Sequence, residues 1–326
     1  MKLRPLFILL AALTLSATVR SAPGTLIPRP QEATRLDGQF VFTTGIPVVY
    51  ASGLEPLAEY IADYIPLQRL DDRTWTAGAA LRLSLDGTMD DESYRLTVTP
   101  QGVQVVGADY GGVFNGLQTL LQLLPPEVYT GQATLPLTVD ACRIEDAPRF
   151  HYRGMMLDVV RTWMDADRVK RHIDLLSHLK INKLHLLLSN DEGWRLEIKS
   201  HPELTEIGAW RGGDSPVMPV YGKWDEKYGG FYTQDEMRDL IRYAAVRNVE
   251  IIPELDLPGH SRNFARVHPE ILCDYTPTCV RRPVTTTARC GVLRARRTTG
   301  CWPIFWASWR RSSRRSTSIS AATRST

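Results

Sequence analysis

Polar side chains able to do chemistry gather directly after two apolar runs of the sequence. The first run leads, in LLLSNDEGWRLEI, into Asp191, Glu192, Trp194 and Arg195. The second leads, in IIPELDLPGHSR, into Glu254, Asp256 and His260. A histidine held by a proline- and glycine-stiffened loop beside carboxylates can be oriented and have its pKa raised, which suits a substrate clamp or a proton relay. We therefore expect these groups to face the mouth of one pocket.

Plainer interpretations of the same residues stay open. DEGW also describes an acidic turn with a packing tryptophan, and His260 can bond locally to its own turn. Asp191 and His260 would together supply two metal ligands, but no third ligand follows at regular spacing. We expect neither a metal nor a cofactor.

A third polar group follows the apolar residues of LDVVRTWM, where Arg161 stands close after Asp158. A guanidinium can offer a two-pronged donor to neighbouring sugar hydroxyls or to a carboxylate. The sequence contains no glycine-rich phosphate loop, no GxSxG turn and no HExxH helix. Arginine, aspartate and histidine beside tryptophans thus favour a carbohydrate pocket over a phosphate site.

The elements that must position these groups alternate between strand and helix. Apolar runs predict strands at 154–159, 183–189 and 249–256. Two amphipathic helices are expected between them, over 166–180 and 234–248.

The helix starts are marked by capping residues. Asp165 precedes the first helix, and Thr233 with Glu236 forms a capping box for the second. Buried strands that alternate with such helices predict parallel βαβ units, whose functional groups stand at the carboxyl ends of the strands. Asp158, Asp191 and Asp256 all fall at predicted strand ends.

Residues 23–147 predict a different architecture. YRLTVTPQGVQVVGAD alternates apolar and polar residues on either side of PQG, which predicts a β-hairpin. GVFNGLQTLLQLL then has leucines at helical spacing and ends before PP. We expect an α+β domain here.

The first residues predict export. Lys2 and Arg4 precede an apolar run from Leu6 to Leu15 that ends in small residues, the arrangement of a secretory signal peptide over residues 1–22. The run is shorter than the ~20 residues that span a bilayer. We expect a periplasmic or extracellular protein with no membrane contact after cleavage. Among its cysteines, Cys273 and Cys279 could close a small loop.

Residues 280–326 differ sharply in charge from the rest. They hold 11 arginines, no lysine and no acidic residue. Since the whole chain carries +3, residues 1–279 carry −8. The arginines lack helical or strand periodicity, and an exported protein rarely meets nucleic acid, so we expect no nucleic-acid partner.

Three ordered segments resemble the catalytic domain of glycoside hydrolase family 20, the β-N-acetylhexosaminidases and chitobiases. They are YRGMMLDVVRTW, HLKINKLHLLLSNDEGWRLEIKSHPELTEIGAWRGG and VRNVEIIPELDLPGHSRNFARVHPEIL. The resemblance runs from about Pro148 to Leu272, and the preceding region is similar to the family's α+β domain.

The resemblance implies a (β/α)8 barrel and a retaining, substrate-assisted hydrolysis, in which the acetamido oxygen of the substrate attacks its own anomeric carbon. It also implies that Arg161 holds the outer hydroxyls of the sugar and that Asp191 and His260 form a supporting pair. Asn190 stands where many members have a further aspartate, and Trp194 is expected to pack rather than to bind sugar.

The family's acid/base glutamate and the aspartate beside it belong to an HxGGDE motif at the end of the fourth strand. The sequence contains no such motif and no acidic residue after Asp274. Read one nucleotide earlier, with suitable codons, residues 317–325 would spell FHIGGDEV. We therefore expect out-of-frame translation that begins between about Thr278 and Ala288, with no catalytic residue retained.

These inferences predict four segments: a signal peptide (1–22), an α+β domain (23–147), the first three βα units of an incomplete (β/α)8 TIM barrel (148–279) and an out-of-frame tail (280–326). We expect the intact protein to be a β-N-acetylhexosaminidase that removes terminal N-acetylglucosamine or N-acetylgalactosamine from glycans, and this chain to be inactive. The alternative is a non-catalytic carbohydrate-binding protein.

Overall fold

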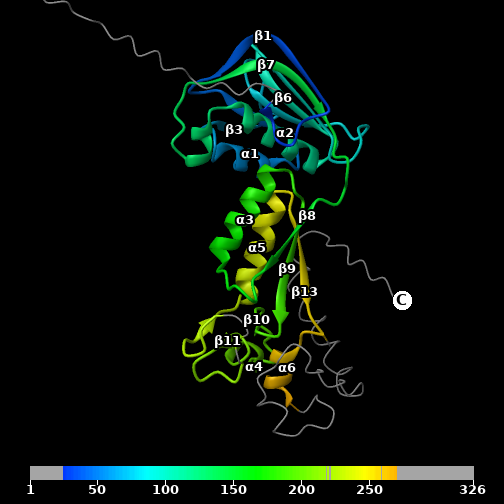
Figure 1. Cartoon of the computed structure of the whole chain (residues 1–326). Helices are drawn as coiled ribbons and strands as arrows, with labels where there is room; N and C mark the ends of the chain where they lie inside the picture. The colour runs from blue at the N-terminus through cyan, green and yellow to red at the C-terminus, as the bar shows by residue number, and fades with distance from the viewer. Residues whose placement is uncertain (1–24, 218, 220–221, 258, 270–326) are drawn as a thin grey trace, which may run out of the picture. The chain divides into compact units, whose positions relative to one another are not determined.

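A computed structural model describes residues 25–217, 219, 222–257 and 259–269. The chain divides into two compact units between Ala147 and Pro148, each with its own sheet and helices (Figure 1). The predicted signal peptide, the predicted loop between Cys273 and Cys279 and the predicted out-of-frame tail lie outside the described residues. Within those residues, no helix is both long and apolar enough to cross a membrane.

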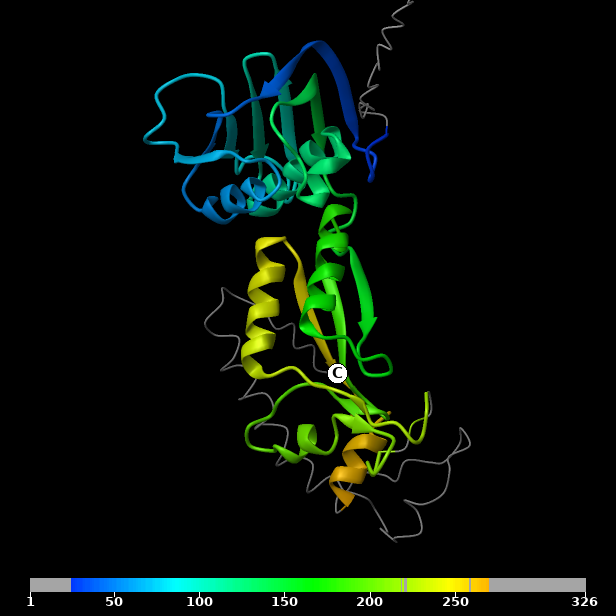
Figure 2. The ribbon, with the colours of Figure 1, turned by 90° about the vertical axis from the view of Figure 1, so that its left-hand side faces the viewer.

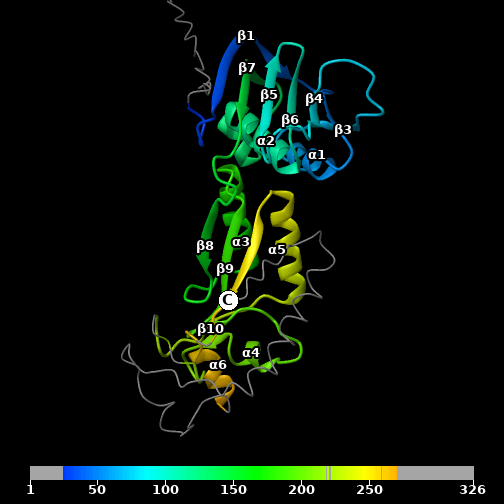
Figure 3. The same cartoon turned by 90° about the vertical axis from the view of Figure 1, so that its right-hand side faces the viewer.

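Among the described residues, unit 1 is a mixed sheet of seven strands with two α-helices against it. The strands are β1 (Glu32–Phe42), β2 (Pro47–Tyr50), β3 (Gln68–Asp71), β4 (Leu81–Leu85), β5 (Tyr94–Thr99), β6 (Gly102–Gly107) and β7 (Leu137–Asp146), in the spatial order β1-β7-β5-β6-β4-β2-β3. The helices are α1 (Glu55–Ala62) and α2 (Tyr110–Leu123), with a 3₁₀ helix η2 (Pro126–Thr130) after α2. Figures 2 and 3 show α1 and α2 along the same face of the sheet.

The predicted hairpin forms as β5 and β6. Leu96 pairs with Val105 and Val98 with Val103, and all four side chains are buried. The predicted helix forms as α2 and packs on this hairpin. A Cβ on Gly116 of α2 would lie 2.5 Å from a methyl carbon of Val105, so glycine allows the helix to approach the strand closely.

In the described part of unit 2, three parallel strands alternate with two long helices. They are β8 (Gly154–Asp158), α3 (Ala166–His178), β9 (Lys183–Asn190), α5 (Gln234–Val246) and β13 (Glu250–Leu255). The shorter elements are β10 (Gly193–Trp194), α4 (Glu203–Glu206), β11 (Trp210–Arg211), β12 (Tyr228–Gly229) and α6 (Arg262–Val267). Strand β9 is central, with β8 and β13 parallel to it and β10 turned back antiparallel at its end.

The capping residues start both long helices as predicted. Asp165 accepts a backbone N–H of the first turn of α3 at 2.9 Å, and Thr233 and Glu236 form both hydrogen bonds of a capping box at α5. Both helices end slightly before their predicted limits. Lys180 and Asn248 follow the ends with φ of 59° and 55°, a left-handed conformation that closes a helix.

The two faces of the unit 2 sheet differ. Leu184, Leu186 and Leu188 of β9 are buried in the core that helices α3 and α5 form on one face (Figure 1). On the other face Lys183 contacts Glu250 at 2.5 Å. The βαβ units predicted from the sequence are therefore present, while the incomplete barrel that the resemblance implies stays a prediction.

Candidate functional site

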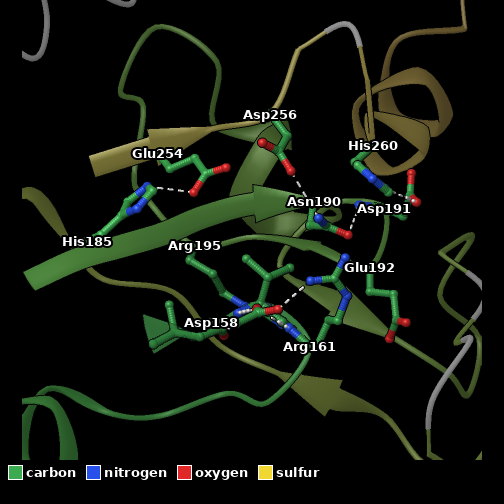
Figure 4. A network of polar contacts seen from close by, with 12 residues as sticks. Asp158, Arg161, His185, Asn190, Asp191, Glu192, Arg195, Glu254, Asp256 and His260 are labelled. Atoms are coloured by element: carbon green, nitrogen blue, oxygen red, sulfur yellow. Dashed lines mark hydrogen bonds and ion pairs between the residues drawn. The ribbon is translucent and has the colours of Figure 1, made fainter. Parts of the chain in front are cut away.

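The carboxyl ends of the three parallel strands lie along one edge of the unit 2 sheet and carry polar side chains (Figure 4). Strand β8 ends at Asp158, β9 ends at Asn190 just before Asp191, and β13 ends just before Asp256. The prediction that three aspartates stand at strand ends is confirmed. Side chains far apart in sequence are thereby brought to one edge.

Asp191 and His260 contact each other at this edge. Nδ1 of His260 lies 3.1 Å from Oδ2 of Asp191, across 69 residues of sequence. Arg262 donates its backbone N–H to Oδ1 of Asp191 at 3.1 Å, and its side-chain Nε lies 3.4 Å from the same oxygen. The His260 side chain is 63% exposed, so its imidazole is open to a ligand.

The environment of Asp191 favours its ionised form. Burial alone would raise the pKa of this carboxyl, but the hydrogen bonds from Arg262 and His260 and the charge of Arg262 outweigh burial and lower the pKa. Asp191 is thus an anion with fixed orientation, able to orient His260 or to accept a hydrogen bond from a ligand.

Asp158 orients Arg161. Its Oδ1 accepts the backbone N–H groups of Val160 and Arg161, both at 2.9 Å, and its Oδ2 accepts from Nη1 of Arg161 at 2.5 Å. One carboxylate therefore fixes the turn after β8 and the guanidinium that the turn presents. The Arg161 side chain is 37% exposed.

Asn190 links the ends of β9 and β13. Its Nδ2 donates to Oδ2 of Asp256 at 3.0 Å, and its Oδ1 accepts the backbone N–H of Asp191 at 2.7 Å. An aspartate at this position could accept the N–H but, when ionised, could not donate to Asp256. The asparagine therefore links the side chain of Asp256 to the backbone of Asp191 and avoids the negative charge that an aspartate would add there.

Glu254 faces His185 across the β9–β13 pair. Its Oε2 lies 2.6 Å from Nε2 of His185. Burial raises the pKa of Glu254, neighbouring Asp256 adds to the rise, and His185 opposes it. A carboxyl whose pKa is raised beside a second carboxyl and an imidazole is suited to hold and pass on a proton. Sequence reasoning missed His185, although it interrupts the apolar run KLHLLLS.

Arg195 holds the loops that carry these side chains. Its side chain is completely buried and donates four hydrogen bonds, all to backbone carbonyl groups. The acceptors are Val159 at 3.1 Å, Val160 at 2.7 Å, Ala209 at 2.5 Å and Gly230 at 2.9 Å. Burial lowers the pKa of Arg195 to about 10. Its guanidinium therefore ties the segment between β8 and Arg161 to two further loops.

A buried ion pair between Glu192 and Arg211 gives a second tie. The two side chains are 2% and 6% exposed. Arg211 also donates from Nη2 to the backbone carbonyl of Arg161 at 2.8 Å. Arg211 thus holds the backbone of Arg161, while Asp158 holds its side chain.

The expectation that all four polar or aromatic residues of DEGWR face a pocket is wrong for three of them. Glu192, Trp194 and Arg195 are buried, at 2%, 1% and 0% exposure, because each has partners within the fold. Trp194 packs near Phe264 and donates from Nε1 to the carbonyl of Leu196 at 2.6 Å. The plainer interpretation, a packing tryptophan, is confirmed for Trp194.

The strand-end residues form no metal centre in the part of the chain that the structure describes. Asp191 and His260 are joined there by no third histidine, cysteine or carboxylate at ligand distance. One group of three such residues does occur among the described residues, and it consists of His201, Glu203 and His268.

Two family profiles match the chain. One is described as "Glycosyl hydrolase family 20, catalytic domain" and matches residues 150–300. The other is described as "Glycosyl hydrolase family 20, domain 2" and matches residues 24–147.

Curated relatives and solved structures point to the same family. A β-hexosaminidase of Vibrio furnissii is 41% identical over 77% of this chain and 40% of its own length, and one of Porphyromonas gingivalis is 36% identical over 76% and 32%. A mutant Streptomyces plicatus β-hexosaminidase in complex with its product GlcNAc has a TM-score of 0.75 and 32% identity, covering 90% of this chain and 58% of that one. The chain thus spans well under half of the curated relatives named here.

Proposed function

Because the chain belongs to glycosyl hydrolase family 20, we propose that unit 2 carries the sugar-holding part of a β-N-acetylhexosaminidase site. The reaction proposed for the intact protein is removal of terminal N-acetylglucosamine or N-acetylgalactosamine from glycans by a retaining, substrate-assisted route. The names of the relatives support this substrate class, since they are β-hexosaminidases and one structure contains GlcNAc.

The observation that carries the proposal is the arrangement of Arg161, Asp191 and His260 at the ends of parallel strands. A guanidinium oriented by Asp158 can donate two parallel hydrogen bonds to neighbouring hydroxyl groups. The ionised Asp191 and the exposed His260 beside it can accept from and donate to the same sugar. These groups bind and orient a sugar without supplying the acid that cleaves its bond.

We propose that this 326-residue chain does not hydrolyse substrate by itself. The HxGGDE motif of the family occurs nowhere in this sequence. Without this motif, the chain lacks the glutamate that would protonate the leaving group and the aspartate that would orient the acetamido oxygen. General acid–base catalysis contributes about 10²–10⁴-fold to a rate, and orientation of the nucleophile contributes further.

The exposed edge strand β8 supports further barrel strands in the intact protein. Among the described residues β8 pairs only with β9, and a strand of a parallel barrel is normally paired on both sides. Met155 and Met156 of β8, which point to opposite faces, are 41% and 47% exposed. We propose that the described strands are the first three of a (β/α)8 barrel, and that residues from between about 278 and 288 onward are read out of frame. Export to the periplasm or the medium is proposed from residues 1–22 alone.

The first experiment is to sequence the gene across the codons for residues 278–326 and beyond. A frame-restored protein and the 326-residue chain are then assayed side by side for release of nitrophenol from 4-nitrophenyl N-acetyl-β-D-glucosaminide. We expect turnover from the restored protein and none from the chain. An inactive but folded restored protein would overturn the proposed activity, and turnover by the chain would overturn its proposed inactivity.

Binding of N-acetylglucosamine to the 326-residue chain distinguishes an inactive enzyme fragment from a non-catalytic carbohydrate-binding protein. We expect calorimetry to show that the chain binds this sugar more weakly than the restored protein does. The variant Arg161→Met of the chain should bind it more weakly still. Equal affinity for the two proteins would instead favour a non-catalytic carbohydrate-binding protein, which needs only Arg161, Asp191 and His260. The variant Arg168→Met is the matched control, since Arg168 lies on the exposed face of α3.

A further inference from the structure

A second cluster of ligand-type side chains is built from residues that the proposed reaction does not use. His201, Glu203 and His268 each offer one ligand atom, and these three atoms all lie within 4.8 Å of one another. Oε1 of Glu203 is 3.1 Å from Nδ1 of His201 and 3.1 Å from Nε2 of His268. Three different side chains therefore converge on one point in space.

The backbone fixes two of these side chains at the start of α4. His201 donates its backbone N–H to Ile198 at 2.9 Å, and its carbonyl accepts from Leu204 at 3.2 Å. Glu203 begins α4 directly after Pro202, so the two ligands on either side of the proline are held in a fixed turn.

The third side chain comes from the end of α6. His268 donates its backbone N–H to Phe264 at 2.8 Å, and its ring lies against the Phe264 ring with centroids 5.1 Å apart. The cluster therefore bridges two elements that are far apart in the sequence, α4 and α6.

The contacts within the cluster determine which ring nitrogen of each histidine carries a proton when no metal is bound. Two imidazoles that both contact one carboxylate oxygen must each present an N–H to it, from Nδ1 of His201 and from Nε2 of His268. A divalent cation would replace both protons, because each neutral imidazole can carry its proton on the other ring nitrogen. One cation would then neutralise Glu203 and occupy both lone pairs.

We propose that His201, Glu203 and His268 form a binding site for a divalent transition metal, with Zn²⁺ the best match. Two imidazoles and one carboxylate are a frequent zinc ligand set, with water in the fourth position. The three side chains are 26%, 32% and 17% exposed, so they are shielded and still accessible to water. No sequence spacing indicated this site, since His268 lies far from the other two ligands.

The metal would act as a clamp between α4 and α6. Helix α6 begins at Arg262, whose N–H and side chain hold Asp191. A metal at the far end of α6 would therefore steady the helix that positions the Asp191 contact. This inference does not depend on the proposed hydrolase activity.

The test titrates ZnCl₂ into the purified 326-residue chain by calorimetry after its accessible cysteines have been alkylated. We expect one Zn²⁺ per chain, and an affinity at least about tenfold lower in His201→Gln and in His268→Gln, since even residues behind a metal ligand change affinity by that factor. His172→Gln removes a histidine outside the cluster and should bind Zn²⁺ like the wild type. Equal affinity in all four proteins would overturn the proposal.

Two readouts identify the ligands without relying on a variant that folds poorly. Co²⁺ bound to the wild-type chain should show the visible bands of nitrogen and oxygen ligands without the near-ultraviolet charge-transfer band of a thiolate. Zn²⁺ should also slow amide hydrogen exchange in residues 262–267. A thiolate band, or exchange that Zn²⁺ leaves unchanged, would show that the three residues are a hydrogen-bonded cluster only.

Discussion

Replacement of Arg195 by methionine should destabilise unit 2 strongly. The side chain is completely buried and makes four hydrogen bonds to the carbonyl groups of Val159, Val160, Ala209 and Gly230. Methionine has a similar volume and fills the space, but it offers no donor. All four carbonyl groups would lose a charged donor in a place that water reaches poorly.

The magnitude follows from two opposing contributions. A hydrogen bond from a charged donor contributes at least about 1.5 kcal/mol, so four bonds contribute at least about 6 kcal/mol. Burial opposes this, since it lowers the pKa of Arg195 to about 10, two to three pKa units below the ordinary value of an arginine; at about 1.4 kcal/mol per pKa unit this corresponds to roughly 3–4 kcal/mol. The loss expected for Arg195→Met is the difference, about 2–3 kcal/mol.

Urea unfolding at pH 7, followed by tryptophan fluorescence, measures this loss. Unit 2 dominates the signal of the described residues, because Trp163, Trp194, Trp210 and Trp224 lie in it and Trp75 lies in unit 1. The free energy of unfolding of Arg195→Lys should lie between those of the wild type and Arg195→Met, because one ammonium group cannot reach four carbonyl groups. The control Arg168→Met, at an exposed helix position, should lose less than about 1 kcal/mol. A loss for Arg195→Met no larger than that of the control would show that the four hydrogen bonds of Arg195 contribute little to the stability of unit 2.

Three further changes test other parts of the fold. Asp191→Asn should destabilise the chain at pH 7, because ionisation of Asp191, whose pKa is lowered, stabilises the fold above the unfolded-state pKa of about 3.9. That difference should shrink as the pH falls through the lower folded-state pKa, and a pH-independent difference would contradict the assignment. Gly230→Ala should lower the melting temperature by several degrees, because its Cβ would lie 2.4 Å from the Trp163 ring; an unchanged melting temperature would show that Trp163 moves away freely. Glu236→Ala removes an acceptor 2.8 Å from the backbone N–H of Thr233 and should lose about 1 kcal/mol in thermal unfolding, whereas no loss would mean that the capping box contributes nothing.

Local patterns were sufficient to predict the elements that carry the site. Asp165 and Thr233 start α3 and α5 as their types and spacing predicted, because an N-cap acts within one helical turn. The strand ends were predictable for a similar reason, since a polar residue such as Asp158 that follows a buried run marks the point where the run meets solvent.

The role of Arg195 could not be predicted from the sequence. Its acceptors are main-chain carbonyl groups up to 36 residues away. Every residue has such a group, so the residue types do not indicate which of them accept a hydrogen bond. Arginine is also seldom completely buried, so DEGWR reads as a polar turn. His185 was missed because it lies within an apolar strand, and its partner Glu254 becomes visible only once the register of β9 and β13 is known.

The backbone at His260 carries a further consequence. Its φ of 46° lies in the left-handed region, which costs an L-residue about 1–2 kcal/mol and costs glycine almost nothing. A glycine at this position would therefore make the chain more stable than the histidine that stands there. Stability alone would favour glycine over this imidazole, so at position 260 robustness and the sugar recognition that we propose for His260 favour different residues.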